Sequence, residues 1–321
     1  MAAVIPSEGF LLGIRSAYRS WAPLIPDANP LEVVERCLSK CSTQRVFDQH
    51  ADSRLRSNLP RAAVLSRHEG LRTVEFSDWR FPLFVKTDAV WSNTGHDSWV
   101  RRAENLDDLI RITSLALRTH QHVLVQEKVC GLKSSVNVLL HDGEVIAESM
   151  CLAHHENPHT GGLTALRQMW WWDEMAADAR LRLEALGWQG VAMFEYKWEP
   201  ETGQFWFIEI NARYWGFLNM DVLAGKDFPR VQMDARLGYP EKILGPGPVG
   251  FRCRLLFPME VGYLMSLLRD PTVPASRKAQ AALGALATGI DPRVRGDLWF
   301  PGDRGLYWRQ MYAFIVHLGR A

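Results

Sequence analysis

The sequence contains no Cys-x-x-Cys motif and no long apolar run. Its five cysteines are scattered and odd in number, which argues against a disulfide framework or a zinc finger and favours free thiols in a reducing cytosol. No apolar stretch approaches the roughly 20 residues that a membrane helix needs. The amino-terminus lacks the basic and apolar segments of a signal peptide. We therefore expect a cytoplasmic protein.

An excess of charge is also missing. The chain has 37 Lys and Arg residues against 36 Asp and Glu, with a formal net charge of +1. Such a balance gives no general attraction to nucleic acid or to an anionic membrane, so we expect neither as a partner. The 321 residues include 47% hydrophobic and 23% charged side chains, the balance of a folded globular chain long enough for two domains.

Hydrophobic periodicity predicts a mixture of helices and strands. Apolar residues at helical spacing predict helices over 31–58, 106–117, 173–186, 259–269, 276–288 and 305–318. Runs rich in β-branched and aromatic residues predict strands over 81–85 and 122–126, and hairpins over 134–150 and 190–210. Asn105 is placed as a helix N-cap, and Gly187 as a helix end. The fold class is therefore α+β, with a mostly helical carboxyl-terminal extension.

The hairpin over 190–210 carries the strongest chemical signal. Side chains alternate between the faces of a strand, so those expected on one face of its second strand are Phe205, Phe207, Glu209 and Asn211. If Glu195 faces the same way, three oxygen donors converge, and hard divalent cations such as Mg²⁺ prefer such ligands. Arg213 follows on the same face, where a guanidinium suits the charge of a phosphate. A solvated sheet face with ordinary surface acids is the alternative interpretation.

The letters E-I-N-A-R at the end of this hairpin resemble the metal-binding strand of ATP-grasp enzymes, especially relatives of the large subunit of carbamoyl-phosphate synthetase. Three further stretches stand in the order of that family. F-P-L-F-V-K, ending at Lys86, resembles the strand that ends in a phosphate-binding lysine. V-L-V-Q-E-K-V-C-G, over 123–131, resembles the hinge that meets the adenine, and H-T-G-G from His159 resembles the ribose and phosphate loop. Lys40 matches the family's first lysine, and the resemblance covers roughly residues 30–235.

The resemblance implies that two α+β subdomains clasp ATP, with Mg²⁺ (or Mn²⁺) bridging its phosphates. It implies an ATP-dependent carboxylate–amine (or thiol) ligase, in which the carboxylate of a small molecule or peptide attacks the γ-phosphate and an amine then displaces phosphate. The implied metal ligands are Glu195, Glu209 and Asn211, and the implied catalytic groups are Arg213 and Lys86. The implied nucleotide contacts are Lys40, Lys86, Gln126, Glu127, Lys128, Val129, Ser134 and His159.

On this template the chain divides into four parts. These are a remnant of an amino-terminal subdomain (1–30), the ATP-grasp lid (31–128), the metal-binding and catalytic subdomain (129–240) and a mostly helical region (241–321). The short amino-terminal part leads us to expect a homodimer or a partner chain that supplies the missing walls. The loop after Lys86 holds one glycine where several are usual, and Ser134 stands where the family often has an acid. Two alternatives therefore stay open: a partner-dependent ATP-binding protein without turnover, and an ATP-grasp kinase.

Three other motifs have simpler interpretations. His154, His155 and His159 lack the H-E-x-x-H frame of a helical zinc site, so we interpret the first two as part of a polar loop near the nucleotide. The three tryptophans over 170–172 are expected to fill the core or to form a pocket wall. The run 251–257, with Arg252 and Arg254, predicts either a wall that receives an anionic substrate or an amphipathic strand.

Overall fold

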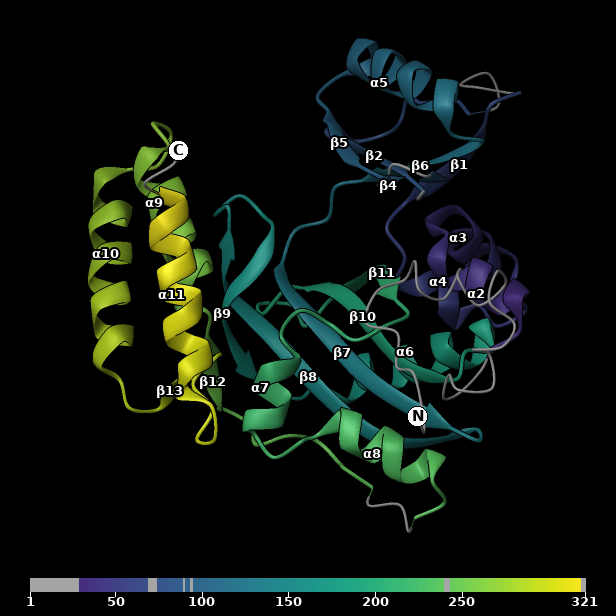
Figure 1. The fold of residues 1–321 in the computed structure, drawn as a ribbon. Helices are drawn as coiled ribbons and strands as arrows, with labels where there is room; N and C mark the ends of the chain where they lie inside the picture. Colours follow the sequence, from purple (N-terminus) through teal and green to yellow (C-terminus); the bar gives the residue numbers. More distant parts are fainter. Residues whose placement is uncertain (1–28, 69–73, 89, 93–94, 240–242, 319–321) are drawn as a thin grey trace.

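The computed structural model describes residues 29–68, 74–88, 90–92, 95–239 and 243–318. These residues form a small sheet with one helix, a larger sheet with helices on both faces, and a group of carboxyl-terminal helices (Figure 1). In chain order the elements are α2 (Leu31–Leu38), α3 (Lys40–Gln49), α4 (Arg54–Ser57), β1 (Ala62–Ser66), β2 (Leu83–Thr87), β3 (Val90–Ser92), β4 (Gly95–Asp97), β5 (Val100–Ala103), α5 (Leu106–Thr119), β6 (His122–Glu127), β7 (Leu132–His141), β8 (Glu144–Asn157), β9 (Leu163–Met169), α6 (Asp173–Leu186), β10 (Gly190–Trp198), β11 (Phe205–Asn211), α7 (Leu218–Leu223), α8 (Phe228–Arg236), β12 (Arg252–Arg254), the irregular turn η3 (Leu256–Glu260), α9 (Val261–Arg269), α10 (Ala275–Ile290), β13 (Val294–Gly296) and α11 (Arg304–Leu318).

The small sheet, which we call the lid, is antiparallel with the strand order β1-β6-β2-β5. Strand alternation decides what each of its faces contacts. Leu83 and Val85 on β2 and Val123 and Val125 on β6 are buried in one cluster with α5. The side chains between them point to the opposite face of the lid. Lys86 is therefore presented toward the rest of the molecule.

The large sheet has the strand order β11-β10-β7-β8-β9-β12-β13, and only its β12–β13 pair is parallel among the paired strands described. One face packs against α6 and the other against α7 and α8, which lie in front of the strands in Figure 1. On β10, Phe194 and Tyr196 enter the α6 cluster, whereas Val191 and Met193 enter the α7–α8 cluster. The next side chain after Met193 on the face that packs against α7 and α8 is Glu195. An acidic group therefore follows the last apolar side chain of β10 on this face.

Helices α2, α3 and α4 pack on the large sheet. Their buried side chains belong to the cluster that contains α6 and β10 (Val33, Val34, Cys37, Phe47 and Leu55). The predicted helix over 31–58 is interrupted at Ser39, whose side chain caps α3 by accepting the Ser42 N–H at 3.0 Å. The first strand of the lid sheet, β1, begins at Ala62. The structure therefore differs from the predicted lid of 31–128, because the helices before Ala62 pack on the large sheet.

Several other sequence predictions are confirmed. Helix α6 spans 173–186 as predicted, and Gly187 ends it in a left-handed conformation with φ of 69°. The Asn105 side chain caps α5 by accepting the Asp108 N–H. Both predicted hairpins form, as β7–β8 and β10–β11, and three helices follow near the carboxyl-terminus. Trp170 lies in the core, with its ring centroid 4.4 Å from that of Trp198. The short strands β1, β5, β9 and β13 were not predicted, whereas β12 lies in the run 251–257, for which an amphipathic strand was one of the two interpretations.

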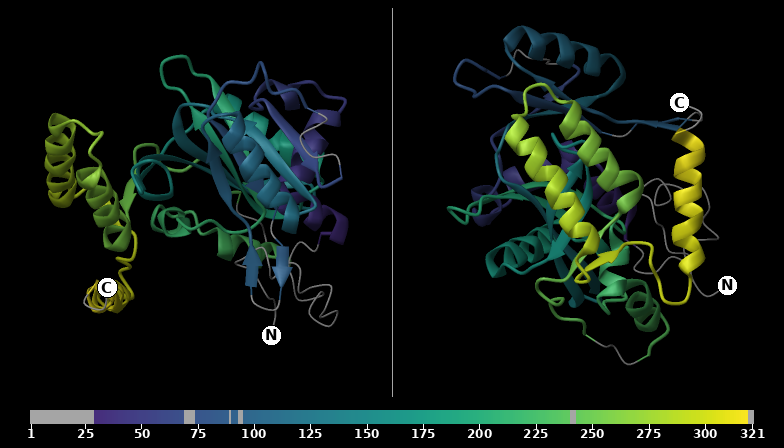
Figure 2. Two further views of the ribbon diagram at one scale, coloured as in Figure 1. Left: turned by 90° about the horizontal axis from the view of Figure 1, so that it is seen from above. Right: turned by 90° about the vertical axis from the view of Figure 1, so that its left-hand side faces the viewer.

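The carboxyl-terminal helices lie at the far edge of the large sheet, beyond β9 and β12 (Figure 2). In the described part of the chain, no helix combines the length and the apolar character needed to cross a membrane. Residues 1–28, nearly all of the predicted remnant subdomain, lie outside the described residues. Of the loop after Lys86, the structure describes the β3–β4 pairing but not residues 89, 93 and 94.

Candidate functional site

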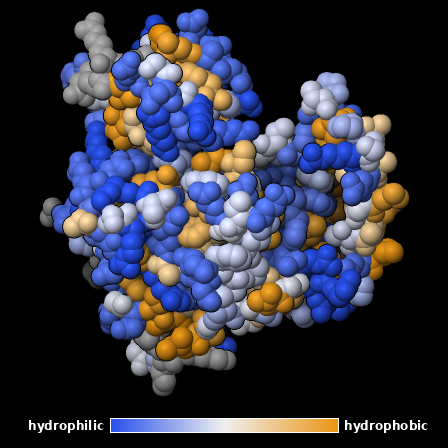
Figure 3. Space-filling view, turned by 180° about the vertical axis from the view of Figure 1, so that it is seen from behind, coloured by the Kyte–Doolittle hydropathy of each residue, from blue (hydrophilic) through white to orange (hydrophobic). Residues whose placement is uncertain are grey.

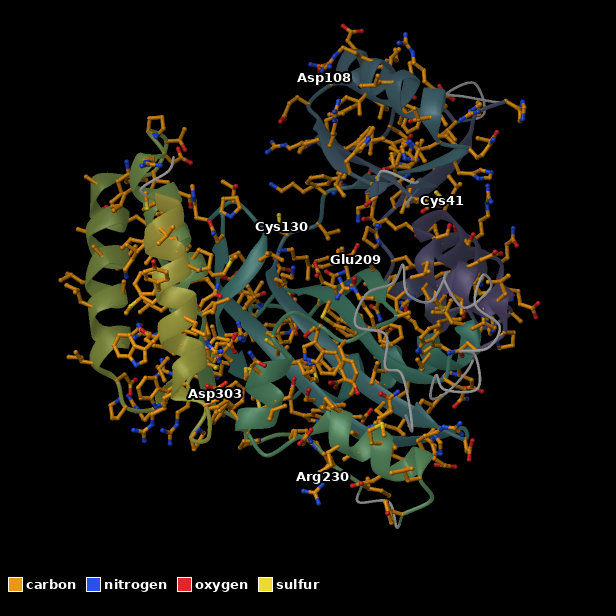
Figure 4. The ribbon with its side chains drawn as sticks, in the orientation of Figure 1. Cys41, Asp108, Cys130, Glu209, Arg230 and Asp303 are labelled. Carbon is orange, nitrogen blue, oxygen red and sulfur yellow. The ribbon has the colours of Figure 1, made fainter. Side chains whose placement is uncertain are left out.

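A cavity of about 630 Å³ lies between the lid and the large sheet, and we call it the cleft. The lid contributes side chains from β2, β5 and β6, and the large sheet contributes side chains from β7, β8, β10 and β11. The connection 127–131 between β6 and β7 and the loop 160–162 complete its walls. Figure 4 labels Cys130 and Glu209, two residues of the cleft lining, which lie below the lid. The cleft is therefore built where the lid faces the uncovered end of the large sheet.

A β-bulge aims the acidic residues into this cleft. The β10–β11 ladder skips Ile208 beside the cross-strand pair of Glu195 and Glu209. One extra residue reverses the alternation, so Phe205 and Phe207 are buried in the α6 cluster while Ile208 and Glu209 line the cleft. The prediction that the four alternate residues of β11 share one face is therefore wrong for the two phenylalanines.

The structure brings the three predicted metal ligands together. Glu195 and Glu209 are direct cross-strand neighbours, and Asn211 Nδ2 donates to Glu209 Oε1 over 3.4 Å. Burial raises the pKa of Glu195, and the Glu209 charge adds to this effect although the Lys133 ammonium opposes it. Burial also acts to raise the pKa of Glu209, but Lys40 and Lys86 outweigh it and the pKa is lowered. The carboxylate pair thus depends on nearby positive charge.

Three lysines supply that charge from different elements. Lys133 Nζ on β7 lies 2.9 Å from Glu195 Oε2, and Lys40 Nζ at the start of α3 lies 3.9 Å from Glu209 Oε2. Lys86 is buried and donates to Gln126 Oε1 over 2.7 Å, and its burial lowers its pKa. Cations from the lid, from α3 and from the large sheet therefore surround the two carboxylates.

Arg213 lies in a second, smaller space. A cavity of about 140 Å³ between α2, α3 and β11 is lined by Lys40, Asn211 and Arg213. It shares Ile208 and Glu209 with the cleft. Arg213 Nη1 donates to the Tyr214 carbonyl over 2.8 Å. The carboxylate of Glu209 thus lies where the two spaces adjoin.

The donor set fits a hard divalent cation. Carboxylate and amide oxygens are ligands that Mg²⁺ accepts, and two carboxylates side by side gain from a shared cation. Among the described residues, no group of three or more His, Cys, Asp or Glu side chains is placed to hold a metal ion. A cation between Glu195, Glu209 and Asn211 therefore needs further oxygens from a ligand, as is usual for Mg²⁺ beside phosphates.

The three histidines form no such group. His154 lies 3.2 Å from the Gln168 amide oxygen, and His155 lies 2.7 Å from a Glu260 carboxylate oxygen. His159 contacts α9, with Nε2 3.1 Å from Asp270 Oδ2 and Nδ1 3.1 Å from Ser266 Oγ. The structure thus places His159, a predicted nucleotide contact, outside the lining of the cleft. Its neighbours Thr160, Gly161 and Gly162 line the cleft instead.

Ser134 is also placed outside the cleft. Its hydroxyl donates to the Cys151 carbonyl and accepts from Trp170 Nε1, each over 3.0 Å, and the residue is 1% exposed. Strand alternation explains this, because Lys133, one residue earlier on β7, takes the position that faces the cleft. Lys133 was not predicted, although a lysine at the start of an otherwise apolar strand is a signal that could have found it.

The remaining predicted contacts line the cleft. Gln126, Lys128 and Val129 belong to its wall, as does Glu127. The Glu127 carboxylate accepts the Arg80 N–H over 3.0 Å and lies 3.9 Å from Arg61, so it is held by the lid. Glu156 and Lys197, 3.8 Å apart, line the cleft without having been predicted.

Sequence comparison identifies no relative: no family model and no curated protein matches the chain. Solved structures do match. A biotin carboxylase–β,γ-ATP complex from Campylobacter jejuni is 16% identical, with 78% of this chain and 58% of that chain covered and a TM-score of 0.56. An L-amino acid ligase from Bacillus licheniformis is 18% identical, with 74% and 55% covered and a TM-score of 0.51. A D-alanine–D-alanine ligase from Bacillus anthracis complexed with ATP is 13% identical, with 73% and 76% covered and a TM-score of 0.50. The chain thus spans little more than half the length of the first two.

Proposed function

We propose that this chain, which has the ATP-grasp fold, is an ATP-dependent ligase that joins a carboxylate to an amine or a thiol. The observation that carries the proposal is the placement of Glu195 and Glu209 of the large sheet in the same cleft as Lys86 of the lid, with Asn211 hydrogen-bonded to Glu209 from the adjoining small cavity. Two solved structures with this fold are complexes with ATP or a β,γ-ATP species.

The cleft offers distinct surroundings for the two ends of a nucleotide. The connection 127–131 provides backbone groups and the side chain of Val129 for an adenine. Lys86 and Lys133 provide charge for the phosphates, and Lys133 Nζ also donates to the Gly162 carbonyl over 3.3 Å, which ties it to the loop 160–162. Phosphoryl transfer requires mainly positioning and neutralised charge from a protein, and these residues supply both. Mg²⁺ held by Glu195, Glu209 and Asn211 would neutralise phosphate oxygens when it is bound.

The proposed reaction has two steps. A carboxylate oxygen of the first substrate forms a bond to the γ-phosphorus as the bond to the bridging oxygen of ADP breaks. The amine nitrogen or thiol sulfur then bonds to the acyl carbon, phosphate leaves, and a proton is released. Lys40 and Arg213, in the small cavity that adjoins the cleft at Glu209, supply positive charge for the carboxylate and for the phosphate that is transferred.

The experiment measures ADP released from ATP with Mg²⁺ in the presence of pooled carboxylic acids and pooled amines or thiols. We expect ADP release that requires both pools, and a loss of at least 100-fold in Glu209→Gln, because one oxygen ligand loses its charge. Glu201→Gln, in the exposed turn of the same hairpin, is the matched control and keeps its activity. Full activity in Glu209→Gln would rule out the metal-site assignment.

The same experiment separates the two alternatives. ADP release that needs only an acceptor and yields a phosphorylated product without a new amide or thioester identifies a kinase. Calorimetric binding of ATP with Mg²⁺ that is weakened in Glu209→Gln, but without ADP from any pool, identifies a nucleotide-binding protein without turnover. Either result contradicts the ligase proposal while leaving the nucleotide site in place.

A further inference from the structure

The carboxyl-terminal region contains a cavity of its own, which we call the C-terminal pocket. Its volume is about 370 Å³, and it lies between β12, β13, η3 and α11. Most of the side chains that line it are apolar, among them Leu256, Phe257, Leu298, Trp299, Trp308 and Met311. The volume is at the lower end of the range for small-molecule sites.

The C-terminal pocket is separate from the cleft. Among the described residues, the two linings have no member in common. In the large sheet, β9, none of whose residues lines either cavity, lies between β12 and β8, the nearest strand that lines the cleft. At about 4.8 Å for each position, β12 and β8 are roughly 10 Å apart. A ligand in the pocket therefore occupies a different place from a nucleotide in the cleft.

Arg254 contributes the positive charge of this pocket. Strand alternation places Arg254 on the face opposite to that of the buried Cys253, and its partner across the parallel pair is Gly296. The Arg254 guanidinium extends toward α10, where Nη1 lies 4.0 Å from the position that a Cβ would take at Gly289. The nearby acids are already paired: Asp297 with Arg167, and Asp291 with Arg252. The Arg254 carbonyl accepts the Asp297 N–H over 2.8 Å, but within the part of the chain that the structure describes its guanidinium forms no ion pair or hydrogen bond.

Aromatic side chains line the mouth of the same pocket. Trp299 and Trp308 are 40% and 54% exposed although both belong to the lining. The Tyr307 ring lies between them, with centroids 5.4 Å from Trp299 and 5.5 Å from Trp308, both edge-on. Figure 3 shows apolar surface along the right-hand edge, where the carboxyl-terminal helices lie in that view. Exposed tryptophans around a concave site are typical of a surface that binds an apolar ligand.

We propose that the C-terminal pocket binds a small hydrophobic carboxylic acid, with its carboxylate on Arg254 and its apolar body between Phe257, Trp299 and Trp308. A guanidinium pairs with a carboxylate through two parallel hydrogen bonds, and an apolar surrounding strengthens that pair. One cation matches the single charge of a carboxylate. The apolar walls match an aromatic or branched aliphatic body, and a free phosphate would gain nothing from them. This site is independent of the proposed ligase function.

The test uses 3-phenylpropionate and its neutral amide as probes, with binding measured by calorimetry on the full chain. MgATP and the Glu209→Gln variant are included in separate runs to exclude binding in the cleft. We expect saturable binding of the acid, at least tenfold weaker binding of the amide, and no change with MgATP or in Glu209→Gln. Arg254→Gln weakens binding of the acid at least tenfold, whereas Arg295→Gln, the matched control on the exposed face of β13, leaves it unchanged.

A second variant covers the case in which Arg254→Gln fails to fold. Met311→Trp adds volume inside the C-terminal pocket and abolishes binding of the acid if the pocket is the site. Equal binding of acid and amide, unchanged binding in Arg254→Gln, or no binding at all overturns the proposal. If the protein is a dimer that Trp308→Glu dissociates, and the acid does not bind, the pocket is a contact between copies and the proposal is wrong.

Discussion

The large sheet holds charged side chains at both of its ends, and the two groups differ in how far solvent reaches them. In the cleft, the side chains of Lys133, Glu195 and Glu209 are between 13% and 30% exposed, as is that of Lys40 in the adjoining small cavity. Below the far edge, Arg167 and Asp297 form an ion pair in which the side chains are 1% and 2% exposed. Charges of the first kind are accessible from solvent, whereas charges of the second kind are enclosed by the fold.

The difference follows from what covers each end. The lid lies over the cleft with space between the two layers, so water or a ligand reaches the charged groups there. At the far edge, β12 and β13 extend the sheet beyond β9, and Arg167 on β9 is enclosed between them and the ring of Phe217, 5.6 Å away. We therefore expect substitutions in the cleft to change activity and substitutions at the far edge to change stability.

The largest effect is expected from Arg167→Met. It leaves Asp297 buried without its partner, which destabilises a protein by about 3–5 kcal/mol. Chemical denaturation followed by circular dichroism measures this loss. Arg309→Met removes a 73% exposed partner of Asp303 in the same region and is expected to cost less than about 1 kcal/mol. Equal losses in the two variants would show that burial does not distinguish these ion pairs.

A double substitution sharpens this result. Arg167→Met combined with Asp297→Leu removes both charges, and apolar groups of similar size tolerate such a site well. We expect the double variant to be more stable than Arg167→Met alone. If it is equally unstable, the loss comes from packing around Arg167 and not from an unpaired charge.

The next effect concerns Lys86, for which stability and activity are expected to change in opposite directions. Lys86→Met removes a buried ammonium whose pKa burial lowers, so the fold is expected to be as stable as before or more stable. The phosphate charge then loses a partner in the cleft, and ADP formation falls by about 100- to 1000-fold. Thermal unfolding without nucleotide and ADP release measure the two changes. Lys278→Met on α10 is the control, and a parallel loss of stability and activity would contradict the comparison.

The sequence predicts the cleft better than the far edge because the residues of the cleft belong to local patterns. Glu209 and Asn211 are two positions apart on one strand, and Lys86 ends a short apolar run. The errors arise where pairing over long distances decides the outcome. The bulge at Ile208 depends on the register with β10, and Ser134 turns inward because of the register of β7.

The C-terminal pocket could not be predicted as a site for a different reason. Arg254 and Trp308 are more than 50 positions apart in the sequence, and η3, β13 and α11 bring them together. The run 251–257 left a wall and an amphipathic strand as alternatives. In the structure Arg252 pairs with Asp291 while Arg254 lines the pocket, so the two arginines of one pattern have different roles.

The smallest effect is expected from Asp221, a fully buried carboxyl group of α7. Burial raises the pKa of Asp221 to about 6, against hydrogen bonds from Ser149 and Trp215 and the charges of Lys226 and Arg167. The folded state therefore holds this proton more tightly than the unfolded state. Its contribution to stability is fully present below about pH 4 and is lost as the pH rises to about 6. The rise of the Asp221 pKa from 3.8 to about 6 corresponds to a change of at most roughly 3 kcal/mol in the free energy of unfolding. Relaxation of the protein around the carboxylate reduces this change to about 2 kcal/mol.

Asp221→Asn removes this titration and keeps the size of the side chain. We expect the free energy of unfolding of the original protein, relative to that of the variant, to fall by about 2 kcal/mol as the pH rises from 4 through the pKa of about 6. Above that pKa the difference stays level. Asp142→Asn, at the exposed turn between β7 and β8, is the control and leaves the curve unchanged. A difference that grows with pH would mean that Asp221 is stabilised as a carboxylate. An enclosed site beneath α7 would then tolerate an ionised group as readily as the cleft does, and burial would not account for the contrast between the two ends of the sheet.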